Sequence, residues 1–338
     1  MGQGATTREE PSYFAASCAK KETFVNLQGL QIATYEWAHK TEGAPKGIVI
    51  GIHGVSCHLH YEYLNIGSFA GDEGSEGYAG AELHEPRYDG SWIEQLNKQG
   101  YIFTGMDLQS YGMSEGSRGL EHFFEQFEDL PRDHIQFRKN LTAKYPDIPI
   151  YVMGISLGGC IAARLAELDC DHPYGGTILL APMLSLEQLK QKPINKILLP
   201  LAGVISWLTP TARLAEKSMH PEELMFKHFE NDELNEKALK VRSRVAAECL
   251  VGVETTRRNL HKINCPLLAI HSRHDTMTDP AGSELAVDLA SNQMKKLVLL
   301  DEPYLWHELD HEPGNEKVIR IVIDWLEEAA GANAVAKS

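Results

Sequence analysis

Residues 149–168, PIYVMGISLGGCIAARLAEL, decide the fold of this chain. The first five residues are apolar and strand-like, and those from Leu157 onward, rich in alanine and leucine, are typical of a helix. Between them, Gly154-Ile155-Ser156-Leu157-Gly158 fits the pattern G-x-S-x-G. A strand, a sharp turn and a helix in this order form a nucleophile elbow, whose strained turn lifts a serine hydroxyl clear of the sheet. Because the small Gly154 and Gly158 let strand and helix approach, Ser156 is predicted to be a catalytic nucleophile.

Strand-like and helix-like segments alternate along most of the chain. Strands are expected at 23–27, 30–37, 47–53, 101–106, 149–153, 176–180, 266–271 and 296–300, and helices at 91–98, 120–144, 157–168, 280–292 and about 316–329. The segment 47–53 is apolar almost throughout, as a parallel strand buried on both faces requires. The alternation predicts a doubly wound α/β fold, with a mostly parallel sheet and helices on both faces.

Two stretches interrupt this alternation. Residues 64–90 are long, glycine-rich and acidic, and such a loop inside a compact core is usually functional or mobile. Residues 183–258 separate two strand-like segments by far more than one helix and are helical in pattern. The expected organisation is a core of 22–182 and 259–330, a helical cap insertion at 183–258, a flexible N-terminal tail at 1–21 and a C-terminal tail at 331–338.

A serine hydroxyl is a weak nucleophile and needs a base, usually a histidine oriented by a carboxylate. In the α/β-hydrolase fold, which carries such an elbow, the chain order is serine, then acid, then histidine. Asp275 follows the strand-like segment 266–271, and His307 follows 296–300. We predict these two as orienting acid and general base. The rivals are less well placed in this order: Asp279, which suits a helix N-cap, and Asp301, His311, His271 and His274.

The oxyanion formed during acyl transfer needs two backbone N–H donors. One should be the N–H of Leu157, directly after the nucleophile, and the other should come from the loop after the third strand. Gly54 permits a tight turn in that loop, and the N–H of Val55 is the predicted second donor. His53, just before it, is interpreted as a buried structural imidazole that bonds the backbone around the loop.

Composition limits the partners and the compartment. A net charge of −15 repels phosphate backbones, so a nucleic-acid partner is excluded. The six cysteines contain no C-x-x-C pair and suggest free thiols in a reducing compartment. No secretory signal and no apolar run of about 18 residues is visible. We expect a cytoplasmic protein, with peripheral membrane contact as an addition, that needs neither cofactor nor metal; the oligomeric state stays open.

The expected cap carries a helix that is apolar over most of its circumference, between 194 and 208. A small cap has too little protein to cover such a helix, and lysines and arginines flank it. Apolar surface ringed by cations suits a membrane interface or the entry of an acyl chain. The residues proposed to contact substrate are Ile197, Leu201, Ile205 and Leu208. The expected substrate is a lipid ester; a non-lipid small ester, a thioester or acyl transfer to another alcohol would use the same catalytic residues.

With these residues placed, the chain resembles the monoacylglycerol lipase and lysophospholipase group of α/β hydrolases, from about residue 24 to 328. The likeness rests on His53-Gly54, on 107–116 (DLQSYGMSEG), on the elbow, on 180–182 (LAP), and on Asp275 and His307. The stretch 88–92 (YDGSW) and its long preceding loop are similar to lysophospholipase-like proteins of apicomplexan parasites. The group usually has G-H-G-x-S where this chain has 110–114 (SYGMS), and His or Glu where it has Ile155. The resemblance implies cofactor-free hydrolysis of monoglycerides, lysophospholipids or small esters.

The sequence also contains features of two other classes of protein. His307-Glu308-Leu309-Asp310-His311 fits H-E-x-x-H, the helical zinc site of metallopeptidases. Pro303 leaves little room for a helix before His307, and the third ligand of the extended motif would have to be Lys317. A catalytically inactive binding protein on the same fold is disfavoured because all three triad residues are present.

The N-terminus carries a lipidation pattern. Residues 1–6, MGQGAT, match M-G-x-x-x-[ST], which makes Gly2 a candidate for N-myristoylation. One myristoyl chain binds membranes only marginally. A second signal would be needed, and Cys18 is a candidate for palmitoylation.

Overall fold

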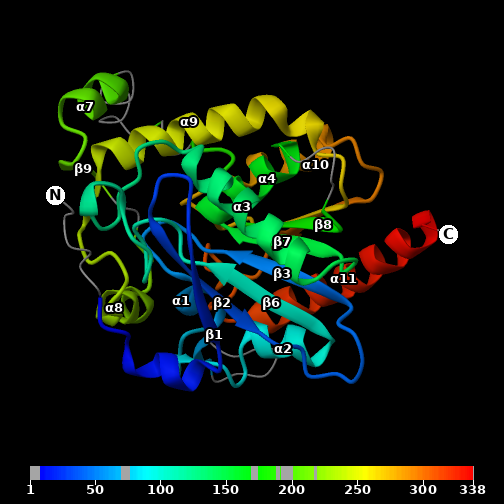
Figure 1. Cartoon of the computed structure of the whole chain (residues 1–338). Coiled ribbons are helices and arrows are strands. Elements are labelled where there is room, and N and C mark those ends of the chain that lie inside the picture. The colour runs from blue at the N-terminus through cyan, green and yellow to red at the C-terminus, as the bar shows by residue number, and fades with distance from the viewer. Residues whose placement is uncertain are drawn as a thin grey trace.

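The structure is a computed structural model that describes residues 8–69, 77–168, 174–187, 191, 201–216 and 219–337. Its centre is an eight-stranded sheet with the order β1-β2-β6-β3-β7-β8-β11-β12 (Figure 1). The strands are β1 Lys20–Val25, β2 Gln31–Trp37, β3 Gly47–Ile52, β6 Tyr101–Met106, β7 Ile150–Ile155, β8 Gly176–Leu180, β11 Leu267–Ser272 and β12 Lys295–Leu300. Strand β2 runs antiparallel to both of its neighbours, and the remaining pairs are parallel. The predicted mostly parallel sheet is confirmed.

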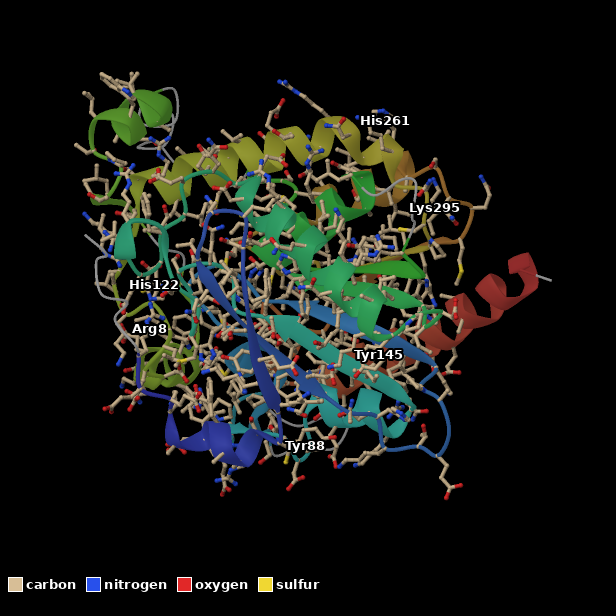
Figure 2. All side chains as sticks on the ribbon, viewed as in Figure 1. Arg8, Tyr88, His122, Tyr145, His261 and Lys295 are labelled. Carbon is tan, nitrogen blue, oxygen red and sulfur yellow. The ribbon has the colours of Figure 1, made fainter. Side chains whose placement is uncertain are left out.

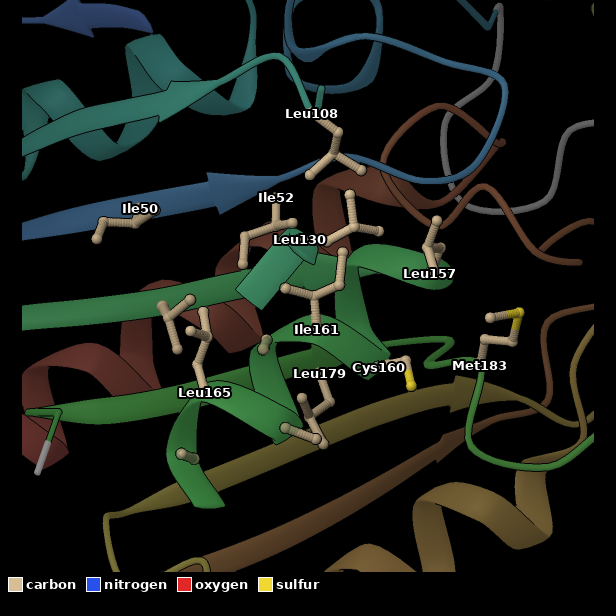
Figure 3. Close-up of a cluster of buried hydrophobic side chains, with 14 of the residues drawn as sticks. Ile50, Ile52, Leu108, Leu130, Leu157, Cys160, Ile161, Leu165, Leu179 and Met183 are labelled. Atoms are coloured by element: carbon tan, nitrogen blue, oxygen red, sulfur yellow. The ribbon is translucent and has the colours of Figure 1, made fainter. Parts of the chain in front are cut away.

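Helices cover both faces of this sheet. One face carries α3 (Asp129–Lys144), α4 (Leu157–Leu168) and α10 (Pro280–Leu289), and the other carries α2 (Trp92–Lys98) and α11 (Asn315–Lys337). In β3, Ile50 and Ile52 join the core cluster with α4 (Figure 3). Val49 joins the cluster on the other face, with α2 and α11. Because successive strand residues point to opposite faces, a strand buried on both sides is apolar throughout.

The long segment 64–90 contains more regular structure than its composition predicts. It follows the short helix α1 (Leu59–Tyr63) and contains β4 (Asn65–Ser68) and β5 (Glu82–Arg87), which pair antiparallel. The described part of the expected cap contains α7 (Ala202–Leu208), α8 (Glu223–Asn231) and α9 (Ser243–Asn259), with β9 (Arg213–Glu216) paired to β10 (Lys240–Arg242). Helix α9 packs on α4, where Cys160 contacts Thr256. The described part of 183–258 is therefore mainly helical.

The N-terminal segment differs from the flexible tail expected at 1–21. A 3-10 helix, η1, spans Ser12–Ser17, with Tyr13 and Phe14 buried. The Phe14 ring stacks on His60 at 4.0 Å, and the Tyr13 hydroxyl donates to Asp232, just after α8, at 2.8 Å. Further out, Arg8 lies near His122 and pairs with the neighbouring Glu121 (Figure 2). Two aromatic side chains in an otherwise polar segment are enough to anchor it.

The C-terminus also differs from the expected tail at 331–338, because α11 continues to Lys337. This last part of the helix is rich in alanine, which has the highest helix propensity of all residues. Conversely, the helix expected at 120–144 begins only at Asp129. Pro131 lies in its first turn, where proline is tolerated.

Candidate active site

The predicted nucleophile, Ser156, lies in the turn between β7 and α4 with φ of 54°. This left-handed conformation is strained for a serine. A Cβ on Gly154 would collide with the carbonyl oxygen of Gly158, and one on Gly158 would collide with that of Ile52 in β3. Only glycine therefore permits this approach of helix and strands. The Ser156 N–H donates to Leu180 O (3.0 Å), which ties the turn to β8.

The predicted acid and base meet at the carboxyl edge of the sheet, where the parallel strands β7, β8, β11 and β12 all end. Asp275 follows β11 and His307 follows β12, and His307 Nδ1 lies 2.7 Å from Asp275 Oδ2. The other carboxylate oxygen accepts the backbone N–H groups of Met277 (2.7 Å) and Thr278 (3.0 Å). The carboxylate is fully buried, so its partners fix the orientation of the imidazole.

A second histidine contacts the same carboxylate, and sequence reasoning missed this role. His271 Nε2 lies 3.1 Å from Asp275 Oδ2, while its Nδ1 lies 2.8 Å from Ser283 Oγ. The Thr278 hydroxyl donates to the same carboxylate oxygen at 2.9 Å. The sequence offers His271 only as a rival base, and its position before the acid disfavours that role. Its spacing of four residues from Asp275 was the one available signal.

Charge and burial set the protonation of this pair. Burial disfavours the protonated form of His307 and lowers its pKa. The charge and hydrogen bond of the adjacent Asp275 favour that form, and the net effect is a raised pKa of the imidazole. Burial would raise the pKa of Asp275, but the charge of His307 and hydrogen bonds from His271 and His307 hold it well below its usual range. The carboxylate therefore stays ionised and stabilises a protonated His307.

The predicted oxyanion loop lies beside the nucleophile. A Cβ built on Gly54 would stand 3.5 Å from Ser156 Cβ. Within the described ranges, neither the N–H of Val55 nor that of Leu157 makes a hydrogen bond to another residue. Both donors are thus available to a substrate oxygen.

Two buried side chains hold this loop. His53 Nδ1 lies 2.8 Å from Gly54 O, and its Nε2 accepts the Leu108 N–H at 2.9 Å. The buried ring thus bonds backbone on both sides, as its structural interpretation expects, and burial lowers the pKa of His53 to about 4. Glu62 Oε2 accepts the Gly54 N–H at 2.7 Å, and burial raises the pKa of Glu62 to about 7. The sequence did not reveal the role of Glu62, because its partner, Gly54, is brought close only by the folding of this tight loop.

Ser156 and His307 are not joined by a hydrogen bond among the described contacts. Ser156 is 7% exposed, and the strand before it ends at the same sheet edge as the strands before Asp275 and His307. Hydrogen bonds between catalytic groups are often long in the free enzyme and tighten only when substrate binds.

The H-E-x-x-H pattern does not form a zinc helix. Residues 303–314 form turns, and α11 begins only at Asn315. His311 Nε2 bonds Tyr61 O at 2.7 Å, while His307 points its Nδ1 at Asp275. In the described ranges, no three His, Cys, Asp or Glu side chains are arranged to hold a metal ion. The two histidines are therefore engaged in different contacts.

The remaining predicted contact residues are only partly described. Ile197 and Gly2 lie outside the described residues. Leu201 and Leu208 in and beside α7 are 49% and 63% exposed, and Ile205 is half-buried. Cys18 is exposed, directly after η1.

The fold, with a serine in the strained turn after β7 and an Asp–His pair at the same sheet edge, is that of an α/β-hydrolase serine hydrolase. Within this class, the chain belongs to the serine aminopeptidase S33 family, whose model matches residues 78–314.

Relatives of known name are similar to this chain. Human monoglyceride lipase is 27% identical over 229 residues, 67% of this chain and 72% of that protein. The monoacylglycerol lipase of Mycolicibacterium smegmatis is 22% identical over 322 residues, 92% of this chain and 98% of that protein. The solved structure of a soluble monoglyceride lipase variant from Saccharomyces cerevisiae, 18% identical, covers 95% of this chain and 99% of that chain with a TM-score of 0.72. This structural likeness supports the fold.

Proposed function

We propose that this chain hydrolyses carboxylic esters of lipids, such as monoacylglycerols or lysophospholipids, through an acyl-enzyme on Ser156. The observation that carries the proposal is the 2.7 Å contact between His307 and the buried Asp275, at the sheet edge where the strained turn presents Ser156. A base oriented in this way is what a serine nucleophile needs.

Each group has a defined role in the proposed reaction. The Ser156 hydroxyl attacks the ester carbonyl carbon while His307 Nε2 takes its proton, and Asp275 stabilises the imidazolium through Nδ1. The N–H groups of Val55 and Leu157 stabilise the oxyanion of the tetrahedral intermediate. His307 then gives its proton to the leaving alcohol as the C–O bond breaks. Water, activated by the same histidine, releases the fatty acid and restores the serine. Neither a metal nor a cofactor takes part in this sequence.

Two observations support a lipid substrate. Most of the similar proteins of named activity are lipases of monoglycerides or monoacylglycerols, alongside a phospholipase and a caffeoylshikimate esterase. The chain also exposes large apolar side chains on and beside α7, among them Trp207 and Leu208, in the segment where substrate contact was predicted. None of the described helices is long and apolar enough to cross a membrane. From the exposed apolar side chains we propose peripheral contact with a lipid surface through α7, with acylation of Gly2 and Cys18 as an additional anchor.

The first prediction concerns labelling by a fluorophosphonate. Wild-type protein should be labelled rapidly at Ser156, because among the described serines it is the one for which we propose both a base and oxyanion donors. Ser156→Ala should stay folded, lose labelling, and lose about 10³-fold or more in turnover of a monoglyceride. Peptide mass spectrometry and a titration assay for fatty acid measure both. Ser114→Ala is the matched control, since Ser114 is also buried but bonds Asp107 O and contacts neither Asp275 nor His307. Rapid labelling of the Ser156→Ala protein would overturn the assignment.

A further inference from the structure

The turn that carries His307 lies outside any helix or strand, so its geometry must come from side chains. The fully buried side chain of Glu312 holds much of this turn in place. Its Oε1 accepts the N–H groups of His307 (3.0 Å) and Glu308 (3.1 Å), and its Oε2 accepts that of Trp306. Three successive backbone donors thus point at one carboxylate. Hydrogen bonds to an ionised acceptor are stronger than neutral ones, so Glu312 defines where the backbone of His307 stands.

His220 connects this turn to the segment just before α8. Its Nε2 lies 3.0 Å from Glu312 Oε1, and its Nδ1 accepts the Glu222 N–H at 3.0 Å. Because Nδ1 is an acceptor here, Nε2 carries the hydrogen and donates to Glu312. The ring also meets Trp306 edge-on, with centroids 5.1 Å apart. The connection lies in the interior, since the His220 side chain is only 3% exposed.

The loop before β5 meets the same turn. Tyr78 packs edge-on against His220 at 5.8 Å, and its hydroxyl reaches toward Tyr304 O (3.5 Å). At Gly77, with φ of +62°, a Cβ would collide with the Tyr304 ring. Two segments that are distant in the chain, one before β5 and one before α8, therefore meet the turn that carries His307.

We propose that Glu312 and His220 are positioning residues for His307, and that they link the geometry of the base to the segment that precedes α8. The inference rests on the proposed function, in which His307 is the general base. A displacement of about 1 Å in a catalytic group can cost about 10²-fold in rate. A carboxylate that only capped the start of α11 would bond N–H groups of that helix, whereas Glu312 bonds the N–H of the base itself.

The test compares five variants, three test variants and two controls, by steady-state kinetics on a soluble short-chain ester, so that binding to a lipid surface plays no part. Glu312→Gln keeps the size of the side chain but removes its charge and one acceptor. His220→Leu removes the donor, and His220→Gln retains an N–H near the position of Nε2. Glu167→Gln, in α4, and His134→Gln, in α3, are the matched controls, because both residues are buried and neither contacts Glu312.

Glu312→Gln and His220→Leu should lower kcat by about 10- to 100-fold while KM changes little. The proton resonance of the His307–Asp275 hydrogen bond should weaken or shift in both. His220→Gln should recover part of kcat, and the two controls should keep it. If Glu312→Gln does not fold, the kcat values of the two His220 variants test the positioning role by themselves.

Two failures are distinguishable. If Glu312→Gln and both His220 variants keep the wild-type kcat and imidazole resonance and only melt at lower temperature, the positioning role is wrong. In that case His307→Ala would still be inactive, and the proposed function would stand. If His307→Ala itself keeps activity, the proposed function fails first.

Discussion

At the scale of single residues, chemistry at this site depends on how one buried carboxylate is shared. Three side chains hydrogen-bond to Asp275 Oδ2, namely His307, His271 and the Thr278 hydroxyl. Its charge is therefore fixed in place before any substrate arrives. Such prearranged charge stabilises the imidazolium formed when the serine loses its proton, without reorganisation of solvent at that moment.

This arrangement predicts the pH dependence of turnover. His307 must be neutral to accept the serine proton, so kcat/KM should fall as pH decreases through its pKa. Because Asp275 raises that pKa, the acid limb should lie above the ordinary histidine value of about 6.5. Asp275→Asn removes the stabilising charge, so the limb should move to lower pH and kcat should fall about 10³- to 10⁴-fold. A pH–rate profile measures both the position of the acid limb and kcat. Asp301→Asn is the control, because Asp301 is exposed. An unchanged limb in Asp275→Asn would contradict the pairing.

The residues that sequence could and could not reveal differ in one physical respect. Ser156 was identifiable from its local motif, and Asp275 and His307 from their order after successive strands. Glu312 and His271 were not, because their roles arise from contacts within folded turns that no pattern encodes. Histidine and glutamate also occur often as ordinary surface residues, so composition alone gave no reason to select them.

At the scale of elements, the core strands were the most predictable part. Segments such as 101–106 and 176–180 coincide with β6 and β8, because burial on both faces makes a parallel strand apolar at every position. The paired strands β4 and β5 lie in a polar, glycine-rich stretch, where no alternation marks them. The N-terminal 3-10 helix was missed because only Tyr13 and Phe14 distinguish it from a polar tail.

Anchoring of that N-terminal helix can be measured. Phe14 is buried against His60 and Tyr35, so Phe14→Ala should lower the free energy of unfolding by about 3 kcal/mol or more. Urea denaturation of the full chain measures this loss. Leu27→Ala is the control, because Leu27 is 75% exposed and its change should stay within about 0.5 kcal/mol. Equal stability of both variants would mean that the segment behaves as the loose tail expected from its composition.

At the scale of the whole molecule, apolar exposure and net charge point to different kinds of membrane contact. Trp207 and Leu208 are 74% and 63% exposed, and Leu201 and Val204 are 49% and 55% exposed. The chain carries a net charge of −15, which opposes approach to anionic lipids. Arg213, one of the cations expected to ring the apolar helix, is paired with the buried Glu236. Contact with a bilayer should therefore depend on apolar burial more than on charge.

The last prediction follows from that balance. Trp207→Ser combined with Leu208→Ser should weaken binding to zwitterionic phosphatidylcholine vesicles and lower turnover of a long-chain monoglyceride in micelles. Turnover of a soluble short-chain ester should stay unchanged, because the proposed triad lies at the sheet edge and not in α7. Vesicle co-sedimentation and paired kinetics measure the two effects, and binding should vary little with salt because no charge pairing drives it. Val25→Ser with Leu27→Ser is the matched control, since these side chains are similarly exposed but belong to β1 and the turn after it.

Protein expressed in bacteria measures the contribution of α7 to vesicle binding without acylation. The same comparison with protein from eukaryotic cells, together with the Gly2→Ala variant, measures the additional contribution of an acyl chain. Equal losses on micellar and soluble substrates would show that α7 supports the fold and does not meet the lipid surface.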